Sequence, residues 1–158
     1  MKIVIGCDKG GLRLKQPIMD AQREEGHEII EVGAMSLEQI VPHSQTAHAA
    51  AEVIQRGEAE MGILICGTGM GMSICANKHK GIYAAVVESV YAAEYSRKIN
   101  NANILCMGAF MIGETMAKDM ALAFVHTEFL QNFPEWRVNF LSGQLQYVQE
   151  LENEQFAK

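Results

Sequence analysis

A cysteine followed by three alternating glycines forms the segment of this chain best suited to chemistry. Cys66 ends an apolar run that starts at Met61, and glycines occupy positions 67, 69 and 71 before a stretch with helical spacing. A strand–turn–helix unit of this kind leaves backbone N–H groups unpaired at the start of the helix, where they can bind an oxyanion. The helix dipole also favours the thiolate form of a cysteine beside the turn. A thiolate base next to an oxyanion site can move a proton on the carbon adjacent to a carbonyl.

The glycine loop admits two other interpretations. Gly67, Gly69 and Gly71 match only part of the G-x-G-x-x-G pattern of dinucleotide-binding folds, because position 72 is methionine. No acidic residue stands in the usual ribose-binding context after the second strand. The glycines could also serve only to let the helix pack against the sheet. An anion or oxyanion loop is the favoured interpretation.

The side chains around the loop also have structural explanations. Most cysteines are small buried hydrophobes, and that interpretation suits Cys7, Cys75 and Cys106. Cys66 differs because it lies where the strand exits toward the ligand edge of a sheet. Thr68 could bond a substrate oxygen or merely cap the turn. Cys66 and Thr68 are therefore the candidate catalytic side chains.

Asp8 and Lys9 follow the first apolar run and form a second candidate group. The Asp8 carboxylate could bind substrate hydroxyls beside the Lys9 cation. Alternatively, the two residues could form a solvated turn in which Asp8 is an N-cap. His43, next to Pro42, could face the same site or begin a surface helix. The five histidines show no ligand spacing such as HxxxH, so neither a metal site nor a cofactor is expected.

The composition restricts the class of protein. The chain has 158 residues, 49% of them hydrophobic, which predicts a single folded domain over residues 1–158. The net charge of −6 argues against a general nucleic-acid surface, although local cations could still bind a small anion. No apolar run approaches the roughly 18 residues of a membrane span, and the four cysteines show no CxxC spacing. A reduced, cytoplasmic protein is the expectation.

Apolar runs alternate with amphipathic segments along the chain. The pattern predicts five strands, at Lys2–Gly6, Glu28–Val32, Met61–Cys66, Ile82–Val87 and Ile104–Met107. It predicts helices over Leu12–Glu25, His43–Arg56, Met70–Lys78, Ser89–Ile99 and Glu114–Leu130, with a charged terminal helix over Gly143–Ala157. Short apolar strands separated by helices indicate a three-layer α/β/α Rossmann-like fold with a five-stranded parallel sheet and a C-terminal helical tail. Ligands in such sheets bind beyond the carboxyl ends of the strands, which here carry Asp8, Cys66 and Gly108.

Four motifs resemble those of ribose-5-phosphate isomerase type B, a family that also includes the galactose-6-phosphate isomerase subunits. They are Gly6-Cys-Asp8, the segment Gly62–Ile74, Ala76-Asn-Lys78 and Asn100-Asn-Ala-Asn103. The similarity runs from Lys2 to about Phe129. It implies metal-free interconversion of an aldose and a ketose through a cis-enediolate. It also implies a homodimer or tetramer with active sites at the subunit interface, where the tail 131–158 packs on the partner.

The resemblance further implies roles for individual residues. Cys66 is the implied base, which carries a proton between C1 and C2 of the sugar. Lys9 and Arg137 are left to hold an anionic group, and His43 is a further candidate for contact with the substrate. The other residues implied to bind the substrate are Asp8, Gly67, Thr68, Gly69, Met70, Gly71 and Asn100.

Several positions depart from the ribose-type pattern. Ile99 stands where a histidine opens the furanose ring, and isoleucine can neither give nor take a proton. Lys9 replaces a second histidine, while Phe110 and Phe133 stand at positions of phosphate-binding arginines. These departures indicate an open-chain substrate, such as a tetrose or tetrulose phosphate, or an anionic group that is smaller or less charged than phosphate.

We therefore expect an aldose–ketose isomerase of a sugar phosphate or related acidic sugar, with no nucleic-acid or membrane partner. Other readings stay open. The chain could be one subunit of a heteromeric galactose-6-phosphate isomerase-type complex, an isomerase of a non-phosphorylated acidic sugar, or a regulator that binds such ligands without turnover. The sequence leaves open the sugar, its chirality and its chain length.

Overall fold

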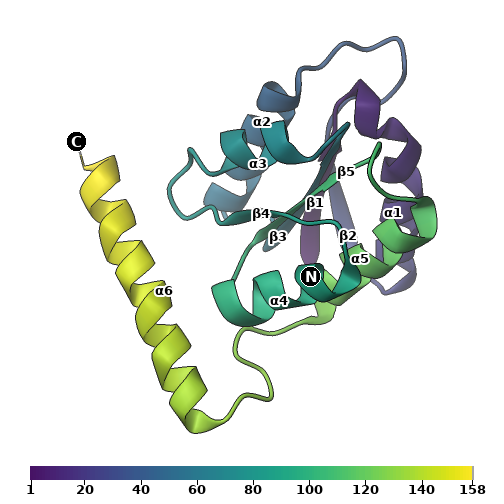
Figure 1. Ribbon diagram of the computed structural model, residues 1–158. Helices are drawn as coiled ribbons and strands as arrows, with labels where there is room; N and C mark the ends of the chain where they lie inside the picture. The colour runs from purple at the N-terminus through teal and green to yellow at the C-terminus, as the bar shows by residue number, and fades with distance from the viewer. Residues whose placement is uncertain (158) are drawn as a thin grey trace.

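Five parallel strands form the central sheet of the computed structural model, which describes residues 1–157 (Figure 1). The strands are β1 (Lys2–Cys7), β2 (Glu28–Gly33), β3 (Met61–Cys66), β4 (Ala84–Val86) and β5 (Ile104–Gly108), and their order in the sheet is β2-β1-β3-β5-β4. The helices are α1 (Leu12–Glu24), α2 (His43–Gln55), α3 (Met70–Ala76), α4 (Val90–Asn100), α5 (Glu114–His126) and α6 (Glu135–Phe156), with a short 3-10 helix, η1, at Lys9–Gly11.

Helices cover both faces of the sheet, because its central strands are apolar on both sides. One face packs against α1, α4 and α5, through residues such as Leu14, Ala93 and Phe124. The other face packs against α2 and α3, through residues such as Ala50 and Met72. All six residues of β3 are buried, as expected for a parallel strand between two helical layers. The predicted three-layer α/β/α fold is confirmed.

The carboxyl ends of β1 and β3 lie side by side at one edge of the sheet. Cys7 of β1 pairs with Ile65 of β3, and Cys66 pairs with Gly108 of β5. The Asp8 backbone N–H donates a hydrogen bond to the Ile65 carbonyl oxygen at 3.3 Å. In this strand order the connections diverge between β1 and β3, which is where open α/β sheets place their ligand crevice.

The structure corrects the predicted end of the fifth helix. α5 ends at His126 rather than at Leu130. Thr127 is extended, and Leu130 and Asn132 have left-handed backbones with φ of 66° and 57°. The chain therefore turns sharply before Pro134, and nothing helical spans residues 131–134.

The predicted start of the terminal helix is also wrong. α6 begins at Glu135, directly after Pro134, and not at Gly143. Gly143 lies exposed inside the helix, where a glycine costs about 1 kcal/mol relative to alanine without ending the helix. A glycine in a helical pattern predicts a boundary, but here the rigid φ of Pro134 already provides one.

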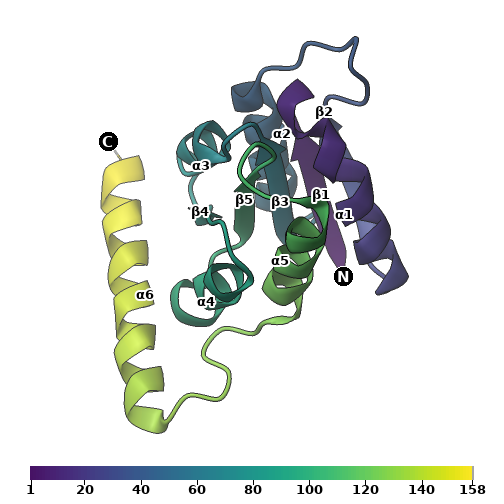
Figure 2. The same ribbon diagram turned by 45° about the vertical axis from the view of Figure 1, so that its right-hand side comes forward.

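α6 lies beside the β4 edge of the sheet, along α3 and α4, and stands apart from the main body (Figures 1 and 2). Near its end, the Glu152 carboxylate accepts hydrogen bonds from the Gly81 N–H at 2.7 Å and from the Tyr83 hydroxyl at 3.0 Å. Leu141 is the buried residue of this helix, so most of α6 is exposed in a single chain. Among residues 1–157, no helix has the length and apolar character needed to cross a membrane.

Candidate active site

Cys66 is the last residue of β3 and is buried, with 5% of its surface exposed. It belongs to the sheet face covered by α2 and α3. Its Sγ accepts a hydrogen bond from the Gly69 backbone N–H at 3.0 Å. A donor aimed at the sulfur stabilises negative charge there, and the thiolate is the form of cysteine that can act as a base.

The glycines of the loop are required by its geometry. Gly69 has a φ of 77°, and a Cβ built on it would lie 2.9 Å from the Met107 carbonyl carbon. A Cβ on Gly67 would lie 2.5 Å from Cε2 of Phe110. The chain can therefore approach β5 closely enough to aim the Gly69 N–H at Cys66 only without a side chain at position 69, whereas a side chain at position 67 would have to displace the exposed Phe110 ring.

The loop after β5 fixes the Cys66 loop from the other side. The Ala109 N–H donates to the Cys66 carbonyl oxygen at 2.8 Å, and the Phe110 N–H donates to the Gly67 carbonyl oxygen at 2.9 Å. The exposed Thr68 lies against Gly108, where an added Cβ would meet the Thr68 backbone at 2.8 Å. Two carbonyl groups of the loop are thereby satisfied, which fixes the peptide planes that carry the remaining N–H groups.

Asp8 and Lys9 lie next to this loop, as predicted from the ends of the strands. The Asp8 Oδ1 accepts a hydrogen bond from the Gly11 N–H at 3.1 Å, so Asp8 does cap η1. Gly10 packs against the Gly67 backbone, with an added Cβ 3.1 Å from its nitrogen. Lys9 is exposed. The capping and substrate-binding interpretations of Asp8 are therefore compatible.

His43 begins α2 and its imidazole lies against the first turn of α3. A Cβ on Gly71 would lie 2.6 Å from the His43 Nε2. The structure thus places His43 beside the glycine loop, rather than isolated on the surface. We refer to the residues gathered here as the Cys66 group: Asp8, Lys9, His43, and Cys66 to Gly71.

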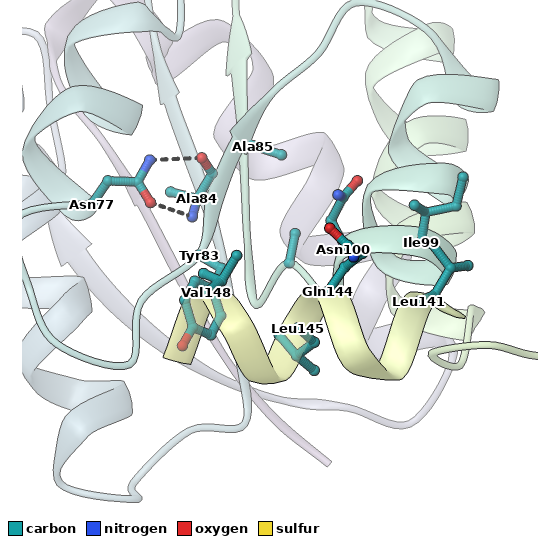
Figure 3. A pocket seen from close by; sticks show the side chains of 11 residues that line it. Asn77, Tyr83, Ala84, Ala85, Ile99, Asn100, Leu141, Gln144, Leu145 and Val148 are labelled. Carbon is teal, nitrogen blue, oxygen red and sulfur yellow. Dashed lines mark hydrogen bonds between the residues drawn. The ribbon is translucent and has the colours of Figure 1, made fainter. Parts of the chain in front are cut away.

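Asn100 and Arg137 do not join this group within one chain. Asn100, the last residue of α4, lines a pocket of about 480 Å³ between α4, β4 and α6, next to Ile99 (Figure 3). Leu141, one helical turn beyond Arg137 on α6, lines the same pocket, which none of the residues from Cys66 to Gly71 reaches. We call Ile99, Asn100 and Arg137 the α4–α6 group.

The sequence does not predict the position of one side chain beside the loop, Phe110. The Phe110 ring lies directly on Gly67, although 78% of the residue is exposed. The sequence showed Phe110 only as the replacement for an arginine. Gly108, which ends β5 at the same sheet edge as Cys66, was the signal that the following residues would reach the loop.

The other cysteines differ from Cys66 in their surroundings. Burial raises the pKa of the Cys7 thiol to about 11, and burial also raises the pKa of Cys106. These two thiols are therefore protonated at neutral pH. The Cys75 Sγ donates to the Ser44 carbonyl oxygen at 3.2 Å. Within the described residues, no cluster of three or more His, Cys, Asp or Glu side chains is arranged to hold a metal ion.

The site combines a buried thiol with an N–H donor, a glycine loop beyond the end of a parallel strand, and nearby exposed hydroxyl and cationic side chains. Such an arrangement can carry out proton transfer in an α/β enzyme. The family model described as Ribose/Galactose Isomerase matches residues 3–141. The chain belongs to this family, and it is an isomerase of the aldose–ketose type.

Similar proteins cover almost the whole chain. The 4-deoxy-4-sulfo-D-erythrose isomerase of Clostridium sp. (strain MSTE9) is 46% identical over 158 residues, or 100% of this chain and 99% of the relative. The D-erythrulose-4-phosphate isomerase 2 of Mycolicibacterium smegmatis is 38% identical over 131 residues, which cover 82% and 86% of the two chains. The solved structure of Clostridium thermocellum ribose-5-phosphate isomerase B has a TM-score of 0.88 and 37% identity, and covers 98% of this chain and 99% of that one.

Proposed function

We propose that this protein isomerises a four-carbon sugar that carries a terminal anionic group, through a cis-enediolate with Cys66 as the base. The observation that carries the proposal is the hydrogen bond from the Gly69 N–H to the Cys66 Sγ, at the end of a strand and beside the glycine loop. It supports a negatively charged sulfur next to further backbone donors.

The reaction needs two proton movements. The Cys66 thiolate removes the proton from C2 of the aldose, and the electron pair of that C–H bond forms the C1=C2 bond of the enediolate. The charge that develops on O1 is stabilised by N–H groups of the loop from Gly67 to Gly71. The proton of the C2 hydroxyl moves to O1, near Thr68 and Asp8, and the Cys66 thiol returns its proton to C1 to give the ketose.

An open-chain substrate fits the side chain at position 99. Ile99 lines the α4–α6 pocket with a hydrocarbon group and offers no acid or base for opening a sugar ring. A four-carbon aldose whose C4 carries the anionic group has no free hydroxyl at C4 to close a five-membered ring. Such a substrate reaches the thiol without a ring-opening step.

A sulfonate is the terminal group that we favour over a phosphate. The cations offered by the two groups are Lys9, a point charge, and Arg137, a guanidinium with several N–H donors, and each carries one positive charge. A sulfonate carries one negative charge, whereas a phosphate monoester carries close to two at neutral pH. The Clostridium relative, matched over 99% of its length, acts on a sulfonated erythrose by its name, and the erythrulose-phosphate isomerase of Mycolicibacterium smegmatis is matched over 86% of its length.

A second copy of the chain completes the site in this proposal. Asn100 and Arg137 lie on the α4–α6 face, while α3 exposes Met70 and Ile74, at 51% and 65%. Asn77, the C-cap residue directly after α3, lines the α4–α6 pocket, so the exposed face of α3 is continuous with it. A two-fold axis through such a surface places the α3 end of each copy on the pocket of the other.

The test is proton exchange in D2O, followed by NMR with the purified full-length protein. The panel is 4-deoxy-4-sulfo-D-erythrose, D-erythrose 4-phosphate and D-ribose 5-phosphate. We expect isomerisation with deuterium incorporated at the reacting carbon, fastest for the sulfonate. Absence of exchange on both four-carbon sugars, with exchange on ribose 5-phosphate, would contradict the substrate class.

The matched variants separate Cys66 from the other thiols. Cys66→Ser should lower turnover about 1,000-fold and keep the fold, because a serine hydroxyl is not ionised at neutral pH. Cys75→Ser, at a partly exposed thiol on the neighbouring helix, should leave turnover within twofold, about the size of a neutral hydrogen-bond change. Near-native turnover by Cys66→Ser would remove the cysteine mechanism.

A further inference from the structure

Arg137 stacks on an aromatic ring near the start of α6. Its Cζ lies 4.0 Å from the centre of the Phe133 ring. The Lys98 Nζ lies 5.0 Å from the centre of the same ring and 5.3 Å from that of Tyr95, which stacks on Tyr91 at 4.1 Å. We call these five residues the cation–aromatic row. It joins the exposed end of α4 to the first turn of α6.

Backbone contacts hold Phe133 in this place. The Leu130 N–H donates to the Lys98 carbonyl oxygen at 3.0 Å, which anchors the turn between α5 and α6 on the end of α4. The Phe133 N–H donates to the Leu130 carbonyl oxygen at 3.3 Å, and Pro134 then starts α6. The ring is therefore fixed relative to α4 before the helix that carries Arg137 begins.

Arg137 differs from the other arginines in its partners. Arg23 and Arg56 bond to carboxylates, while Arg13 and Arg97 donate to carbonyl oxygens. Among residues 1–157, the Arg137 guanidinium has neither an ion-pair nor a hydrogen-bond partner, and its contact is the face of Phe133. Stacking uses the plane of the guanidinium and leaves its N–H groups free for an anion.

The net charge of the cation–aromatic row is close to +1, because only one of its two cations lacks a carboxylate partner among the described residues. The Lys98 Nζ is paired with the Glu94 carboxylate at 3.5 Å, so its charge is largely offset. Arg137 remains as an uncompensated guanidinium. One guanidinium offsets the full charge of a sulfonate but only about half that of a phosphate dianion, and its N–H donors can bond the sulfonate oxygens.

We propose that Phe133 is a positioning residue, whose ring holds the Arg137 guanidinium flat so that its N–H groups bind the terminal sulfonate of the substrate. This inference rests on the proposed function, because it assigns the anion to that substrate. Phe133 itself does not touch the reacting atoms. Its effect reaches the substrate through Arg137, at the site shared with the second copy.

The test compares Phe133→Leu with Phe133→Tyr in the full-length enzyme. Loss of the ring in Phe133→Leu should raise KM for 4-deoxy-4-sulfo-D-erythrose about fivefold and leave kcat within twofold, the size expected for an exposed cation–π contact. Phe133→Tyr keeps the ring and should keep KM. In an Arg137→Ala background, Phe133→Leu should raise KM no further. Equal losses in kcat with both variants, or a KM effect that persists without Arg137, would overturn the proposal.

A second readout separates this inference from the proposed function. The unreactive probe 4-hydroxybutane-1-sulfonate is titrated by NMR against each variant. Weaker binding by Phe133→Leu and Arg137→Ala, with binding retained by Phe133→Tyr, supports the role of Phe133 even if no sugar of the panel is isomerised. Unchanged probe binding in all variants, with an active wild-type enzyme, overturns the role of Phe133 and leaves the isomerase proposal standing.

Discussion

The Cys66 group and the α4–α6 group differ in what fixes their atoms. In the Cys66 group, the loop is determined by backbone hydrogen bonds to β5 and by glycines that no other residue can replace without a clash. In the α4–α6 group, the relevant atoms belong to side chains near helix ends, in contact with a helix that is mostly exposed. In the proposed mechanism, proton transfer therefore relies on backbone geometry at the sheet edge, whereas substrate choice relies on side chains that single substitutions can change.

The four departures from the ribose-type pattern change side chains and leave Cys66 and the glycines of the loop intact. Ile99 and Phe133 belong to or adjoin the α4–α6 group, whereas Lys9 and Phe110 are exposed side chains beside the Cys66 loop. Replacing a side chain on an exposed helix end costs little stability, typically within about 0.5 kcal/mol. A substitution in the loop would force the backbone to move, because the loop is too closely packed to admit an added side chain. The same scaffold can thus keep its reaction and change its substrate.

The largest effect is expected from Gly69→Ala, which disturbs the backbone-fixed loop of the Cys66 group. The alanine is strained at a φ of 77°, and its Cβ would clash with the Met107 carbonyl carbon. We expect a loss of about 1–3 kcal/mol in stability and of about 100-fold in kcat, because the N–H can no longer reach Cys66. Thermal unfolding and steady-state kinetics measure both.

Gly26→Ala is the matched control for this prediction. Gly26 has a φ of 81°, but an added Cβ meets no atom within 4 Å. It should therefore show the backbone strain without the loss of kcat. If both variants lost activity equally, the crowding of Gly69 against β5 would not be what positions the N–H donor.

An intermediate effect is expected from Phe110→Ala, which tests the exposed wall of the Cys66 group. Removing the ring from Gly67 should open room beside the loop and raise kcat/KM for ribulose 5-phosphate, relative to a four-carbon ketose, by about tenfold. Ribulose 5-phosphate is suitable because no ring has to be opened. Met111→Ala, at the neighbouring exposed side chain, is the control and should leave this ratio unchanged. An unchanged ratio in Phe110→Ala would mean that chain length is set elsewhere.

The smallest effect is expected from Glu152→Gln, which tests the attachment of α6. Burial and the hydrogen bond to Glu152 raise the pKa of Tyr83 to about 12. A raised pKa means that the neutral tyrosine stabilises the fold fully below pH 10, and that this contribution disappears as the pH rises through about 12. Glu152→Gln should lower the Tyr83 pKa toward 10, seen as tyrosinate absorbance at lower pH. An unchanged absorbance titration would show that α6 is not held through this contact.

Sequence alone predicted most of the Cys66 group because it is built from local motifs. The glycine spacing, the apolar run of β3 and the strand ends determine where Asp8 and Cys66 meet, and parallel pairing then brings them together. The contact of Phe110 with Gly67 could not be predicted from the sequence, because it depends on how the loop after β5 folds back. The hydrogen bond from the Gly69 N–H to Cys66 could not be predicted either, because it depends on the left-handed backbone of Gly69.

The α4–α6 group was less accessible to prediction. The family resemblance named Asn100 and Arg137, but periodicity could not show that they lie on a different face from Cys66. Gly143 led to a wrong predicted start of the tail helix, because the neighbouring helical residues override the low helix propensity of this glycine. The contact of Arg137 with Phe133 arises from the turn in which Leu130 and Asn132 have left-handed backbones. No pattern in the sequence predicts this turn.

The most direct test of the account is complementation between the two groups. Cys66→Ser and Asn100→Ala are purified separately, mixed after mild dissociation, and assayed on the four-carbon sulfonated sugar. If each site combines Cys66 of one copy with Asn100 of the other, random mixing gives mixed dimers with one intact site, and about a quarter of wild-type activity returns. A mixture no more active than its two components would contradict a site shared between copies.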